Sequence, residues 1–192
     1  MTDPHVVALI GSLRTRSYTR IAATRALAAA ESAGATTELI DIREYDLPAF
    51  DPGRDSPGDS ATLTASVDAA DSILLASPMY HGSYSGVLKN AIDYCGFDEF
   101  EGKTVGLLAV SGGSFPLTTL EHLRSVCRAL NAWVIPHQAA IPNGRTAFAD
   151  GEFVDEKTAN RVDTLGHRLV QYADIEPETS TFEAGQNEGA TD

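Results

Sequence analysis

The sequence is poor in cysteine, with only Cys95 and Cys127 among its 192 residues. Each lies in a helix-like segment, and neither has a second cysteine or a histidine at the spacing of a metal ligand. This pattern excludes a structural zinc site and a CxxC redox pair. We expect both cysteines to be small buried hydrophobic residues, which disfavours a thiol-based mechanism.

Lysine is also scarce. The 14 basic residues comprise eleven arginines and only three lysines, Lys89, Lys103 and Lys157, and 27 acidic residues bring the net charge to -13. A surface of this sign repels polyanions, so we expect no nucleic-acid partner. The acids are scattered along the whole chain, which favours a salt-adapted (halophilic) protein, with an ordinary acidic protein as the alternative.

Long hydrophobic runs are absent, since none approaches the roughly 20 residues that cross a bilayer. The sequence therefore predicts no membrane association. The first ten residues, MTDPHVVALI, include an acid and lead straight into an apolar strand, without the basic region or cleavage site of a signal peptide. We expect a cytoplasmic protein with one domain at 1–175 and an acidic, disordered tail at 176–192, which has no lysine or arginine.

Apolar runs and helical patterns alternate along the chain. Strands are predicted at 6–10, 37–42, 72–76, 104–110 and 132–135. Helices are predicted at 21–33, 61–70, 87–95, along a stripe from Leu117 to Leu130, and near 162–172. Short connections between these elements require a parallel sheet with right-handed crossovers. We therefore predict an α/β sandwich in which a five-stranded parallel sheet of order 2-1-3-4-5 carries helices on both faces.

A sheet of this order opens a crevice where the loops after its first and third strands diverge. These loops are GSLRTRS at 11–17 and SPMYHGSYSG at 77–86, the stretches densest in small and hydroxyl residues. Sequence and topology thus predict a ligand site at the carboxyl ends of the two strands.

The first loop has the groups that bind a phosphate. Ser12, Ser17 and Thr19 supply hydroxyls, Arg14 and Arg16 supply positive charge, and a helix N-terminus supplies free amides. Because GxGxxG and the Walker lysine are absent, a monophosphate is favoured over a pyrophosphate or an ATP tail. A plain helix cap with solvated arginines is the alternative for this loop alone.

Three stretches carry a resemblance to a known family. They are GSLRTRSYTR after the first strand, SPMYHGSYSGVLKNAIDYC after the third and SGGS after the fourth. Over about residues 5–140 the chain resembles the NADPH-dependent FMN reductases, a flavodoxin-like family of flavin, quinone, azo-dye and chromate reductases. The resemblance implies a flavodoxin-like three-layer fold, FMN as cofactor and NADPH or NADH as co-substrate. Hydride would pass to bound FMN and then to a small-molecule electron acceptor.

The resemblance also implies which residues hold FMN. Its phosphate would lie on the first loop, held by Ser12, Arg14, Ser17 and Thr19. The flavin ring would contact residues of two further loops, namely Pro78, Met79, Tyr80, His81, Gly82 and Ser83, and Ser111, Gly112 and Gly113. Many family members carry an acid at the position of Met79 and an asparagine at that of His81.

The residues of the second loop support this assignment on physical grounds. Pro78 keeps the preceding residue extended, and Gly82 permits close backbone approach, so that consecutive amides can face a flavin. For His81 we favour a wall of the pocket over a proton donor or an exposed loop residue. Because the flavin carries the chemistry, no catalytic side chain is predicted.

Three other function classes are weaker alternatives. A non-enzymatic flavodoxin-type electron carrier fits the acidity, but the second loop matches the reductases. A receiver-type regulatory domain needs acids at the ends of strands one and three, where Gly11 and Ser77 stand. A serine hydrolase lacks its GxSxG elbow.

The resemblance also places the helix near 87–95 in a dimer interface. Val87, Leu88, Ala91, Ile92 and Cys95 supply more apolar surface than one side of a sheet needs. We therefore expect a homodimer or a dimer of dimers, with a contribution from the helix that begins near residue 117. Packing of the same residues onto the sheet is the alternative.

Overall fold

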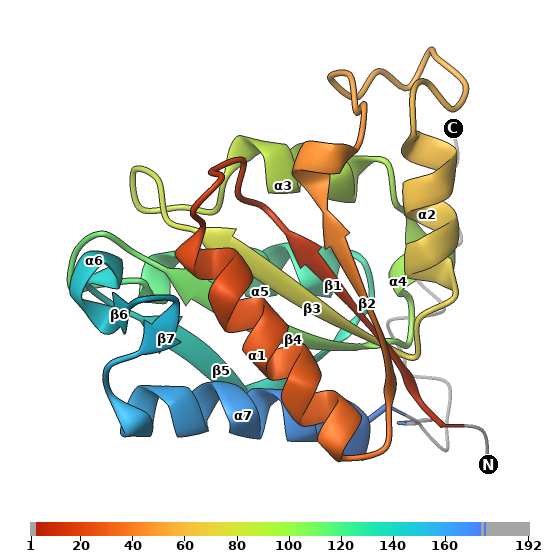
Figure 1. The fold of residues 1–192 in the computed structure, drawn as a ribbon. Coiled ribbons are helices and arrows are strands. Elements are labelled where there is room, and N and C mark those ends of the chain that lie inside the picture. Colours follow the sequence, from red (N-terminus) through yellow and green to blue (C-terminus); the bar gives the residue numbers. More distant parts are fainter. Residues whose placement is uncertain (1–2, 174, 176–192) are drawn as a thin grey trace.

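A computed structural model describes residues 3–173 and 175 of the chain. Its main sheet contains β1 (His5–Ile10), β2 (Thr36–Asp41), β3 (Ser72–Pro78), β4 (Thr104–Val110) and β5 (Trp133–Ile141). All neighbouring strands pair in parallel, in the order β2-β1-β3-β4-β5 (Figure 1). The predicted order and fold class are confirmed.

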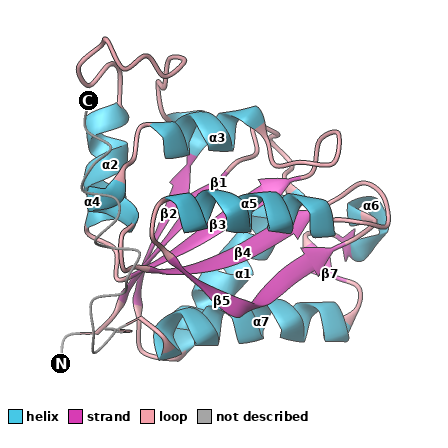
Figure 2. Cartoon of the chain, turned by 180° about the vertical axis from the view of Figure 1, so that it is seen from behind, coloured by secondary structure: helices cyan, strands magenta, loops and turns pink. Residues whose placement is uncertain are grey.

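Helices cover both faces of this sheet. On one face lie α1 (Tyr18–Ser32) and α7 (Glu156–Gln171) (Figure 1). The opposite face carries α2 (Ser60–Asp68), α3 (Gly86–Asp93), α4 (Phe97–Phe100) and α5 (Leu117–Ala129) (Figure 2). The remaining elements are a 3-10 turn, η1 (Ile42–Glu44), a short helix, α6 (Gly144–Ala147), and a hairpin of β6 (Phe148–Ala149) and β7 (Glu152–Phe153).

The strands separate two hydrophobic cores. In β1, Val7 and Leu9 face the core under α3 and α5, whereas the alternate residues face the core under α1 and α7. Both faces are buried, which explains why the strands read as continuous apolar runs. Helices α1 and α7 approach closely at Gly166, where an added Cβ would lie 2.1 Å from the carbonyl oxygen of Ala26.

Two predicted details are wrong. The fifth strand does not end at Ile135 but continues through Pro136 to Ile141. An edge strand tolerates this proline because its missing N–H faces no partner strand, and the pairing with β4 shifts register nearby. Leu117 is 52% exposed, because the buried stripe of α5 begins one turn later at Leu120.

The apolar surplus predicted for the helix near 87–95 is absent at four of its five residues. Leu88, Ala91, Ile92 and Cys95 are all buried within the core of the subunit itself. They therefore leave little apolar surface for a second copy.

The proposed tail at 176–192 lies outside the described residues. In the described part of the chain, no helix combines the length and apolar character needed to cross a membrane.

Candidate functional site

A cleft opens at the carboxyl ends of β1, β3 and β4, where the loops after these strands meet. Its walls are Ser12, Arg14, Ser17, Tyr18, Thr19, Pro78, Met79, Tyr80, Val110, Ser111, Gly112, Gly144 and Arg145. Nine of the thirteen predicted site residues are among them. His81, Gly82, Ser83 and Gly113 are not.

The loop after β1 presents hydroxyl groups to the cleft. Ser17 caps α1, because its hydroxyl accepts a hydrogen bond from the amide of Arg20 at 3.1 Å. Ser12 and Thr19 are each 2% exposed, and within the described residues their hydroxyls form no hydrogen bond to the protein. Neither oxygen is among the buried side-chain atoms that lack a partner in the described residues, so both hydroxyls are open to the cleft and can bind a polar ligand there.

The loops after β1 and β3 are locked together by Ser85. Its hydroxyl donates to the carbonyl of Gly11 at 2.6 Å and accepts from the amide of Leu88 at 3.3 Å, which caps α3. The approach is close enough to require glycine, since a Cβ on Gly11 would lie 2.6 Å from that of Leu88. The Ser85 amide in turn donates to the hydroxyl of Ser77 at 2.9 Å.

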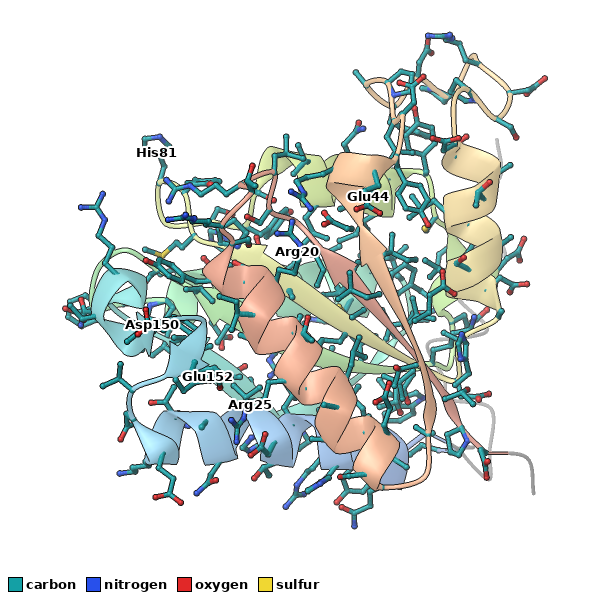
Figure 3. The ribbon with its side chains drawn as sticks, in the orientation of Figure 1. Arg20, Arg25, Glu44, His81, Asp150 and Glu152 are labelled. Atoms are coloured by element: carbon teal, nitrogen blue, oxygen red, sulfur yellow. The ribbon has the colours of Figure 1, made fainter. Side chains whose placement is uncertain are left out.

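A tight turn forms the tip of the second loop. Tyr80 and Ser83 exchange two backbone hydrogen bonds of 2.9 and 3.0 Å. Between them, His81 and Gly82 have φ of +50° and +81°, as in a type I′ turn. This position favours asparagine or histidine, and the His81 side chain points away from the body of the protein (Figure 3). The sequence predicts His81 as a wall of the pocket, but His81 is not among the residues that line the cleft.

The third wall comes from the loops after β4 and β5. Ser111 accepts a hydrogen bond from the Gly144 amide at 2.8 Å, and Gly113 accepts one from the Asn143 amide at 2.9 Å. Gly144 packs against Val110 and Tyr18 so closely that a Cβ would lie 3.0 Å and 3.2 Å from their side chains. These contacts bring the loop after β5 into the cleft, which the sequence did not predict.

Tyr18 and Arg145 are the most informative of the lining residues that were missed. Tyr18 follows the predicted cap Ser17, and its ring stacks on Phe148 of the unpredicted hairpin at 5.1 Å between centroids. Arg14 and Arg145 both line the cleft, and neither forms an ion pair with another described residue. The acidic protein thus has two available guanidinium groups at this site. Arg16 lines a neighbouring hollow instead.

A buried carboxylate lies behind the first loop. Asp41, 5% exposed at the end of β2, accepts hydrogen bonds of 2.7 Å from both Arg20 and Arg43. Burial raises the pKa of Asp41, but the hydrogen bonds from the two arginines outweigh it and lower the pKa below its ordinary value. The carboxylate is therefore charged at neutral pH and holds the Arg20 guanidinium in place.

Comparison with known sequences gives two findings. The model of the NADPH-dependent FMN reductase family matches residues 4–146. An FMN-dependent NADPH-azoreductase of Staphylococcus aureus is 35% identical over 138 residues, which cover 69% of this chain and 73% of that protein.

Solved structures share the fold. A flavoenzyme NAD(P)H:(acceptor) oxidoreductase from Paracoccus denitrificans superimposes with a TM-score of 0.75 at 24% identity, over 89% of this chain and 97% of that one. The apo form of an NADH:FMN oxidoreductase gives a TM-score of 0.76 at 23% identity, over 92% and 93% of the two chains. At these identities the likeness shows the fold alone.

Proposed function

Because the chain belongs to the NADPH-dependent FMN reductase family and is an FMN-dependent NAD(P)H oxidoreductase, we propose that its FMN binds in the cleft described above. One observation carries this placement. The residues that the family resemblance assigns to FMN come from loops far apart in the sequence, and nine of them line a single cavity at the switch point of the sheet.

The first loop fits the phosphate of FMN. The unpartnered hydroxyls of Ser12 and Thr19, the cap residue Ser17 and the first amides of α1 offer donors at one end of the cleft. Arg14 adds a positive charge that no described carboxylate neutralises, and charge-assisted hydrogen bonds to phosphate are among the strongest in proteins. We assign the phosphate to these four residues.

The other walls fit a flat ring. Pro78, Met79, Ser111 and Gly112 line the cleft beside Tyr80, which is 44% exposed and has a ring free to pack against a ligand. Gly112 leaves its backbone open, because a Cβ there would meet no atom within 4 Å. FMN held by these residues would supply the hydride-transfer chemistry between the reduced nicotinamide and the acceptor, so the protein needs only to hold the ring and leave one face accessible.

His81, Gly82, Ser83 and Gly113 receive a different role from that of lining residues. We assign them to the rim, where their backbone sets the position of the loops. Ser83 supports this role, because its hydroxyl and Nδ1 of His122 in α5 are 2.9 Å apart, a hydrogen bond that anchors the turn.

The acceptor is a small molecule, and free flavin, quinones, azo compounds and metal oxyanions are the proposed classes. The Staphylococcus aureus relative is named as an azoreductase, which supports an azo compound as the first acceptor to assay.

A salt-adapted cytoplasmic protein is likewise a proposal, and the scattered acids support its salt adaptation. A homodimer or dimer of dimers also remains a proposal, supported by Phe115 and Leu117, which are 77% and 52% exposed near the start of α5.

The phosphate assignment is tested by Arg14→Ala. Loss of a charge-assisted partner should weaken FMN binding by about ten- to a hundredfold and leave riboflavin, which lacks the phosphate, unchanged. Arg54→Ala is the matched control, because Arg54 is exposed in the loop before α2 and does not line the cleft. Equal losses for FMN and riboflavin in Arg14→Ala would mean that Arg14 does not contact the phosphate.

A further inference from the structure

Arg20 contacts the back of the first loop at several points. Its Nη1 donates to the carbonyls of Arg14 and Thr15 at 3.2 and 3.3 Å, and its Nη2 donates to the carbonyl of Ser12 at 3.4 Å. The same guanidinium donates from Nε to Asp41 at 2.7 Å. Arg20 does not line the cleft. One side chain therefore binds three carbonyls of a short loop from outside the site.

This arrangement also orients the loop amides. In a trans peptide the C=O and the following N–H point in opposite directions. Because the three carbonyls turn toward Arg20, the amides of Leu13, Thr15 and Arg16 turn away from it. Within residues 3–173 and 175, none of these amides donates a hydrogen bond to the protein. These amides are therefore unbonded donors of the loop; Thr15 and Arg16 line the neighbouring hollow, whereas Ser12 and Arg14 of the same loop line the cleft.

Asp41 makes Arg20 a fixed support. The carboxylate is buried at the end of β2, so it anchors the guanidinium to the sheet. Its negative charge also offsets that of Arg20, which reduces any direct attraction between Arg20 and a phosphate. Arg43 donates to the same carboxylate at 2.7 Å and does not contact the loop after β1. Both arginines thus bind Asp41, but only Arg20 also donates hydrogen bonds to the loop after β1.

We propose that Arg20 is a positioning residue that holds the backbone of residues 12–15 in the conformation that binds the phosphate of FMN. The proposal rests on the proposed function, which places that phosphate on this loop. The guanidinium spreads five donors in a planar fork over three nitrogens and meets four acceptors here, whereas an ammonium has three donors on a single nitrogen. The role therefore depends on the shape of the side chain and not only on its charge.

The test compares FMN with riboflavin in Arg20→Gln, by titration of flavin fluorescence. Without the hydrogen bonds from Arg20 to the loop carbonyls, the variant should bind FMN about tenfold more weakly than wild type, whereas its affinity for riboflavin should stay within about twofold of wild type. Arg43→Gln is the matched control and should change neither ligand. Arg20→Lys retains the charge but not the fork, so it should not restore FMN binding.

Two results would overturn the proposal. One is an Arg20→Gln protein that keeps the wild-type preference for FMN over riboflavin, and the other is full FMN affinity in Arg20→Lys, which would mean that charge alone suffices. If Arg20→Gln does not fold by circular dichroism, Arg20→Lys decides by the same comparison. A wild-type protein with no preference for FMN over riboflavin would instead refute the phosphate site of the proposed function.

Discussion

Ser85→Ala should strongly destabilise the loops that form the cleft. Ser85 is 2% exposed, and its hydroxyl caps α3 and donates to the Gly11 carbonyl at 2.6 Å. Its removal deletes a helix cap, which costs about 1 kcal/mol, and leaves a buried carbonyl without its partner, which costs about 1–3 kcal/mol more. The free energy of unfolding should therefore fall by about 2–4 kcal/mol.

Ser60→Ala is the matched control for this substitution. Ser60 is also 2% exposed and begins a helix, but within the described residues its hydroxyl has no hydrogen-bond partner. Removing a buried hydroxyl that is already unpaired should be neutral or stabilising. Urea denaturation of both variants measures the difference. A Ser85→Ala protein within about 0.5 kcal/mol of wild type, or a Ser60→Ala protein that loses as much as Ser85→Ala, would refute the reasoning.

Further predictions concern pH, thiols and assembly. Burial raises the pKa of Asp41, but hydrogen bonds from Arg43 and Arg20 lower it overall, below the ordinary 3.8. The stabilisation by Asp41 should be fully present above about pH 4 and should be lost as the pH falls through the pKa of Asp41 in the folded protein. Urea denaturation at several pH values should show that the free energy of unfolding depends less on pH in Asp41→Asn. An equal pH dependence in the two proteins would contradict this. Burial raises the pKa of Cys95 and Cys127 to about 12. Iodoacetamide at pH 8 should modify both cysteines in urea but not in the native protein, as measured by mass spectrometry. Rapid labelling of the native protein would contradict the burial of the two thiols. Light scattering in molar salt should give a mass of two or four chains, and a fully active single chain would contradict the proposed assembly.

Much of the fold follows from the sequence because the strands of a doubly wound sheet are buried on both sides. The apolar run from Thr104 to Val110 has the same bounds in prediction and structure. At β5 the prediction stopped at Ile135, because Pro136 is normally a strand breaker and only tertiary context reveals a tolerant edge strand. The hairpin of β6 and β7 was missed because strands of two residues carry no detectable period.

The errors at the site have related causes. A fifth strand that ends at Ile135 leaves residues 142–147 far from the edge of the sheet where ligands bind, so the sequence gives no reason to place Arg145 at the site. Had the strand been extended to Ile141, the rule that carboxyl ends of parallel strands meet at one edge would have brought Arg145 into the site. The contacts of Arg20 with Asp41 and the loop carbonyls depend on a side-chain conformation that no sequence pattern specifies.

The most direct test of the proposed function is the absorbance spectrum of the purified protein with FMN during anaerobic addition of NADPH or NADH. The bound flavin should show its band at about 450 nm, and the reduced nicotinamide should bleach it. Addition of an azo compound or quinone should then restore the band. Bound FMN that stays oxidised for minutes with both nucleotides would contradict the account and favour a flavodoxin-type electron carrier.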